Sequence, residues 1–91
     1  MSVKLSLKKP VEIAGETISE LSFDDLTVRM IREIGMPFTL DTTGKSQLSI
    51  DPDTVAKYVH KLAKVPPSTV DKLSPADFLA CQAVIMGFFG E

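Results

Sequence analysis

The sequence predicts an α+β fold in which an N-terminal antiparallel β-hairpin, over residues 3–23, is followed by three to four helices packed on it within residues 24–91. Two features carry this prediction. Near the N-terminus apolar and polar side chains alternate, and farther along apolar side chains recur at helical spacing behind clear helix-start signals. With 91 residues, no internal repeat and no linker, residues 1–91 are expected to form a single small domain.

The two strands of the predicted hairpin are joined by a turn at Gly15. The first strand, residues 3 to 9, carries apolar side chains at alternate positions and is followed by a break at Pro10. The second strand, Thr17 to Phe23, loses its alternation around Glu20-Leu21. This slip predicts either a bulge or an early end of the strand.

A first helix is expected after the hairpin, because Ser22 or Asp24 is suited to cap it and Gly35 and Pro37 to end it. Its apolar residues recur at helical spacing: Leu26, Met30, Ile31 and Ile34. Since two strands alone are marginal in water, we expect this helix to lie across the apolar face of the hairpin.

Residues 36–50 have the composition of a loop, and a short strand is expected around Gln47 to Ile50. Gly44-Lys45-Ser46 invites comparison with a phosphate-binding loop. That motif requires a further glycine at the position of Thr39, so we attribute the match to chance.

The next helix is predicted to start at Asp51-Pro52, because Asp suits the N-cap and Pro the first turn. Its apolar stripe is Val55, Tyr58, Val59, Leu62 and Val65. The opposite side carries Lys57, Lys61 and Lys64. Pro66-Pro67 ends this helix, and residues 68–73 are expected to add a short helical turn.

The terminal helix repeats the start signal at Ser74-Pro75 and is expected to run to about Phe89. Between Asp77 and Glu91 it carries no charge, and a helix that is apolar all round must be buried on every side. Its bulky side holds Phe78, Cys81, Gln82, Ile85, Phe88 and Phe89, with Leu79 and Met86 at the edge. Its small side holds Ala76, Ala80, Ala83, Val84 and Gly87. The run is too short for a membrane span, which needs about 20 apolar residues.

Composition and charge argue against several classes of function. A net charge of −2 and a pI near 5.3 argue against general nucleic-acid binding. No secretory signal or membrane span is visible, so a cytoplasmic location without a membrane partner is expected. The single cysteine, Cys81, is expected to be a buried, inert thiol, and the single histidine, His60, lies on a different predicted helix. We therefore expect no catalytic site, no metal and no cofactor, and no enzyme.

Protein binding remains, and two arrangements stay open. Either both sides of the terminal helix are covered within the domain, or one side is available to another protein's helix or to a second copy of the chain. In the second case the expected protein-binding residues are Leu79, Ala80, Ala83, Val84, Met86, Gly87, Phe88 and Phe89. Such an exposed apolar patch favours oligomerisation when the partner is absent.

Residues at spaced positions over nearly the whole chain resemble the sequence pattern of a known family. The N-terminal set is Leu5, Leu7, Pro10, Gly15, Ile18 and Leu21. The C-terminal set is Val65-Pro66, Val70, Leu73, Asp77, Val84 and Phe88. In this order the chain resembles the small tail assembly chaperones of contractile-tailed, Mu-like bacteriophages and related prophages.

The resemblance implies a non-enzymatic chaperone of the bacterial host cytoplasm, which coats the long, helical tape measure protein during tail assembly. Such a partner presents apolar helices that aggregate unless they are covered. Two alternatives stay open at this stage: a small regulatory, DNA-associated protein, and a structural subunit of a larger phage assembly.

Overall fold

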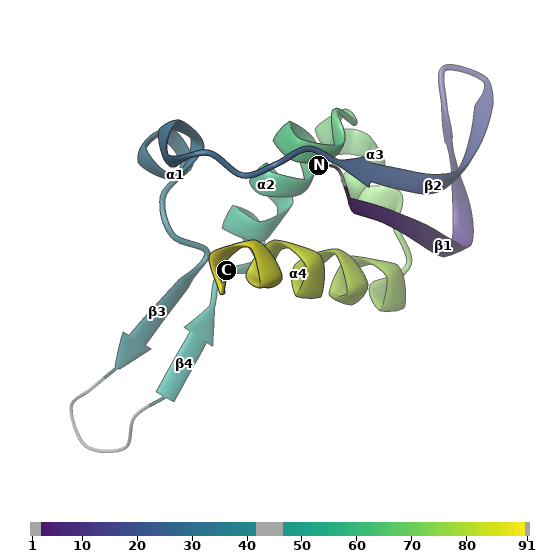
Figure 1. Ribbon diagram of the computed structural model, residues 1–91. Helices are drawn as coiled ribbons and strands as arrows, with labels where there is room; N and C mark the ends of the chain where they lie inside the picture. The colour runs from purple at the N-terminus through teal and green to yellow at the C-terminus, as the bar shows by residue number, and fades with distance from the viewer. Residues whose placement is uncertain (1–2, 42–46, 91) are drawn as a thin grey trace.

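The computed structural model describes residues 3–41 and 47–90. Its elements in chain order are β1 (Val3–Ile13), β2 (Glu16–Phe23), α1 (Val28–Ile34), β3 (Phe38–Asp41), β4 (Gln47–Ile50), α2 (Pro52–Ala63), α3 (Pro67–Lys72) and α4 (Pro75–Phe89) (Figure 1). The N-terminal antiparallel hairpin followed by helices confirms the predicted α+β class. The segment Gly44-Lys45-Ser46 lies outside the described residues.

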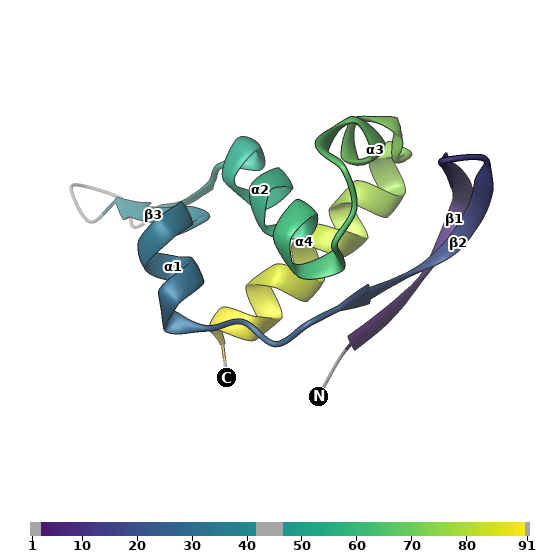
Figure 2. The same cartoon turned by 90° about the horizontal axis from the view of Figure 1, so that it is seen from above.

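Three helices form the centre of the molecule, and a hairpin lies toward each end. Seen from above, the β1–β2 hairpin flanks α2, α3 and α4 on one side, while α1 and β3 lie on the other (Figure 2). The β3–β4 hairpin projects away from the helices (Figure 1), and the molecule reaches 49 Å along its longest axis.

The β1–β2 hairpin turns at Ala14-Gly15, close to the predicted position. Both residues have positive φ, 51° and 84°, which matches the backbone of a two-residue hairpin turn. From this turn the pairing runs to Val3 and Phe23 at the open end.

An irregularity in β1 lies opposite the slip in the apolar pattern of β2. The Cα pairing jumps from Ser6 with Glu20 to Val11 with Ile18. The extra residues therefore belong to β1, so the bulge lies on that strand and not on β2, where it was predicted. The break expected at Pro10 does not end the strand, because pairing resumes beyond the bulge.

The bulge is held in place by α4. The backbone N–H groups of Lys8 and Lys9 donate to the two carboxylate oxygens of Asp77, at 2.9 and 3.0 Å. The residues of the bulge do not pair with β2, so their backbone N–H groups need other acceptors. Pro10 has no N–H, and Asp77 accepts the N–H groups of Lys8 and Lys9. The start of α4 is thereby fixed to the middle of β1.

The hydrophobic core lies between the β1–β2 hairpin and the helices α2, α3 and α4. All residues of the predicted stripe of α2, from Val55 to Val65, are buried, and the lysines on the opposite side are exposed. The hairpin contributes Leu7, Val11, Leu21 and Phe23, and the later segments contribute Val70, Leu73, Cys81 and Ile85. The predicted helix-start signals at Asp51-Pro52 and Ser74-Pro75 are both confirmed.

The start of α1 differs from the prediction. Thr27, and not Ser22 or Asp24, is the N-cap: its side chain accepts a backbone N–H of the first turn at 3.3 Å. Asp24 is engaged elsewhere, since its N–H donates to the Leu62 carbonyl and its carboxylate pairs with Lys64 at 3.3 Å. These contacts tie the end of β2 to the end of α2, so the helix begins later.

The packing of α1 also differs. The helix expected on the apolar face of the hairpin lies against α2 instead, and α2, α3 and α4 cover the hairpin. No residue of α1 is buried, although Met30 and Ile34 pack partly against the core.

Residues 36–50 contain more structure than was predicted. The strand expected at Gln47–Ile50 is present, and it pairs antiparallel with a second strand, Phe38–Asp41, where a loop was expected. The Asp51 N–H donates to the Pro37 carbonyl at 2.8 Å, which closes the base of this hairpin directly before α2.

Candidate protein-binding site

The terminal helix α4 is well capped at both ends. The Ser74 hydroxyl accepts the Asp77 N–H at 3.2 Å, and Pro75 occupies the first turn, where no N–H is needed. At the other end the Gly90 N–H donates to the Gly87 carbonyl. The helix therefore has the predicted bounds.

One side of α4 faces the core. Asp77, Cys81 and Ile85 follow one another at single-turn spacing and are buried. Burial raises the pKa of the Cys81 thiol to about 11, and the nearby negative charge of Asp77 adds to the effect. The thiol is thus neutral and enclosed, as predicted for an inert cysteine.

The opposite side of α4 is open. We call it the outer face, and it consists of Ala76, Leu79, Ala80, Ala83, Met86 and Gly87. Leu79 is 60% exposed, and Ala83 and Gly87 are exposed as well. A β-carbon added at Gly87 would meet no atom within 4 Å. An apolar, charge-free helix face thus stands in solvent, where a surface helix normally carries charged side chains.

The expected protein-binding residues divide into two groups. Leu79, Ala80, Ala83, Met86 and Gly87 lie together on the outer face. The remaining three pack partly against the core and are only half exposed: Val84, Phe88 and Phe89.

Phe89 has a specific packing role at the end of α4. Its ring contacts Phe38 of β3 and Tyr58 of α2 edge to face, with centroid distances of 5.7 and 5.6 Å. The Tyr58 hydroxyl in turn donates to the Gly35 carbonyl at 2.5 Å, and burial raises the pKa of this phenol. These contacts join the end of α4 to α2 and to the base of the second hairpin.

Residues 3–41 and 47–90 contain no group of three or more His, Cys, Asp or Glu side chains that is able to hold a metal ion. His60 donates its Nδ1–H to the Val65 carbonyl at 2.6 Å, which ties the ring to the end of α2. No helix within the described part of the chain is long and apolar enough to cross a membrane.

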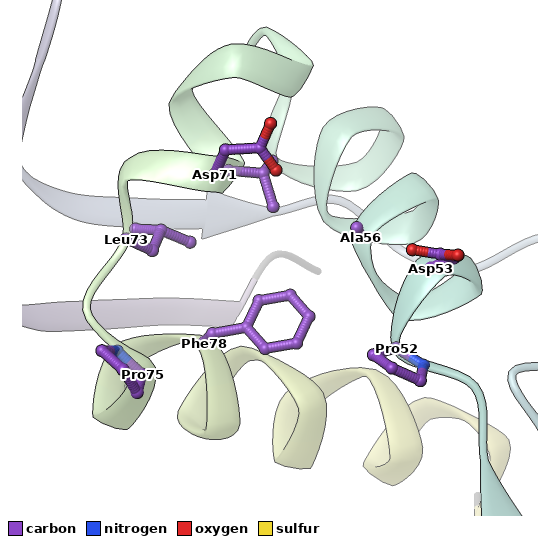
Figure 3. Close-up of a pocket in the computed structure, with 8 residues that line it drawn as sticks. Pro52, Asp53, Ala56, Asp71, Leu73, Pro75 and Phe78 are labelled. Carbon is purple, nitrogen blue, oxygen red and sulfur yellow. The ribbon is translucent and has the colours of Figure 1, made fainter.

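A groove between α2, α3 and the start of α4 was not predicted from the sequence. Its wide part encloses about 360 Å³, and its floor and walls include Ala56, Val70, Leu73 and Phe78. Asp53 and Asp71 lie at its rim, on α2 and α3, and the Phe78 ring points from α4 toward the space between them (Figure 3). No local sequence pattern marks this groove, because its residues come from three separate helices.

Taken together, these features define a small α+β protein that exposes an apolar face on its terminal helix. The family model described as "Phage tail assembly chaperone proteins, E, or 41 or 14" matches residues 4–90. The chain belongs to this family of phage tail assembly chaperones. No curated protein and no solved structure gives a significant match.

Proposed function

We propose that the protein binds and shields the tape measure protein during phage tail assembly, and that it does so without catalysing a reaction. The observation that supports this most directly is the outer face of α4, which leaves Leu79, Ala83 and Gly87 exposed on a helix whose one charged side chain, Asp77, is buried. Family membership supports the general role in tail assembly. We place this activity in the bacterial host cytoplasm, where newly made tail proteins need protection.

The outer face suits an apolar helix of the partner. Small side chains at Ala76, Ala83 and Gly87 let a second helix approach closely, and Leu79 supplies a bulky anchor next to them. Contact with such a helix would remove apolar surface from water on both sides, which favours association by about 25 cal/mol per Å² of buried apolar area before the costs of association are counted.

The substitution Leu79→Asp tests this proposal. Because Leu79 is 60% exposed, the variant should fold, whereas a carboxylate in the centre of the contact would be buried without a partner. We expect wild-type protein to keep a co-expressed tape measure protein soluble and Leu79→Asp to lose this effect. The same variant should reduce the self-association that we expect of the free protein, as measured by sedimentation.

Val28→Asp is the matched control, since Val28 is 71% exposed and lies on α1, which packs against α2. Equal solubilisation by wild type and Leu79→Asp would contradict the proposal. Stable incorporation into assembled tails without any rescue would favour a structural subunit, and a salt-dependent DNA shift would favour a DNA-associated regulator.

A further inference from the structure

The groove between α2, α3 and α4 has a consistent apolar lining over its length. The wide part described above continues into a narrower part of about 110 Å³, which shares Ala56, Val70 and Asp71 with it. Val70 and Leu73 are buried and Phe78 is half exposed, so apolar surface forms the floor. Leu79 of the outer face directly follows Phe78, so the two apolar surfaces are neighbours on α4.

The charges on the rim are arranged unevenly. Asp53 and Asp71 are exposed at the wide part, and neither forms an ion pair with another residue in the described ranges. Lys57 and His60 line the narrow part. Asp53 thus lines only the wide part, Asp71 lines both parts, and the basic side chains line only the narrow part.

We propose that this groove binds a helical segment of the same tail partner, which inserts an apolar side chain and places a Lys or Arg between Asp53 and Asp71. This inference rests on the proposed function, because the partner is the protein that the chaperone shields. A basic residue is required because two carboxylates on opposite sides of an apolar floor attract a cation and disfavour an anion. Lys57 at the narrow end favours an acidic or uncharged side chain of the bound segment at that end. This preference sets the orientation of the segment in the groove.

The lining also argues for a helix and not a strand. The groove is walled by helices α2, α3 and α4, and no strand contributes to its lining. An extended segment placed there would leave backbone N–H and C=O groups without partners, whereas a helix satisfies its own.

The probes for this proposal are two synthetic helical peptides with the same apolar stripe, one flanked by Lys and one by Glu. We expect the full-length protein to bind the Lys-flanked peptide more tightly, by fluorescence anisotropy, and to bind it more weakly as salt is added. Asp71→Lys should weaken this binding by about two- to tenfold, because it replaces an attractive rim charge with a repulsive one.

Asp71→Lys is expected to fold, since the position is exposed and a lysine suits the end of a helix. Glu16→Lys makes the same change of charge at the tip of the β1–β2 hairpin and should leave binding unchanged. Equal binding of both peptides, or no effect of Asp71→Lys, overturns the groove proposal.

If Leu79→Asp alone abolishes solubilisation of the tape measure protein while Asp71→Lys changes neither readout, the groove fails and the proposed function stands. If Asp71→Lys weakens peptide binding while Leu79→Asp leaves solubilisation intact, the groove binds such a helix but the outer face is not the chaperone surface.

Discussion

Asp77 shows how one side chain can organise a small fold. Its carboxylate lies almost fully buried at the start of an otherwise uncharged helix and accepts the Lys8 and Lys9 N–H groups from the bulge of β1. These two hydrogen bonds, from Lys8 first and then Lys9, lower the pKa of Asp77 although burial acts in the opposite direction. The carboxylate form is therefore favoured in the folded state.

Asp77→Asn tests this role through its pH dependence. At neutral pH the variant should have a lower Tm, since an amide offers one acceptor oxygen instead of two and carries no charge. A lowered pKa means that the contribution of Asp77 is present above its ordinary pKa of 3.8 and is lost as the pH falls through the folded-state value. The difference in Tm between wild type and Asp77→Asn should therefore shrink in acid.

Glu12→Gln, at an exposed position of β1, controls for the removal of one negative charge. A difference between wild type and Asp77→Asn that stays constant from neutral pH into strong acid would contradict the assigned role.

From the sequence, Asp77 was predictable only as a residue of a helix start. Its partners lie 69 and 68 positions away, and no local pattern links a helix start to a bulge at that distance. By contrast, the inert Cys81 was predictable, because a cysteine within an uninterrupted apolar run is buried wherever that run packs.

At the scale of elements, the accuracy of prediction followed the strength of the local signals. α2 and α4 each have a capping side chain followed by Pro, and both were predicted with correct starts. Ser22 and Asp24 suggested an earlier start for α1, but Asp24 contacts the end of α2 instead. The strand Phe38–Asp41 was missed because its 4 residues are too few for an alternation to stand out.

Gly87 is the residue of α4 that best separates helix stability from binding. In the free protein Gly87→Ala should raise stability by up to about 1 kcal/mol, because Ala is the better helix former and its methyl group meets no neighbour. If a partner helix approaches the outer face closely, Gly87→Ala should weaken binding, and Gly87→Leu should weaken it more. Thermal unfolding and binding to the tape measure protein measure the two effects separately. Tight binding by Gly87→Leu would show that no close contact forms there.

At the scale of the whole molecule, the fold buries one side of α4 and leaves the other open. β1 and α2 pack against α4, whose Asp77, Cys81 and Ile85 are buried, while Leu79 and Ala83 are exposed. The sequence left two arrangements open for this helix, because periodicity gives the sides of a helix but not the number of neighbours that cover them. The structure leaves the outer face uncovered in the isolated chain.

Binding of the partner at the outer face is tested most directly by the reactivity of a thiol placed there. In Ala83→Cys the new thiol is exposed, whereas the native Cys81 is buried and contributes little background. A maleimide should modify free Ala83→Cys rapidly and should modify it far more slowly in complex with the tape measure protein, while Glu16→Cys at the hairpin tip reacts equally in both. Equal rates for Ala83→Cys in the free protein and in the complex would contradict the claim that this face binds the partner.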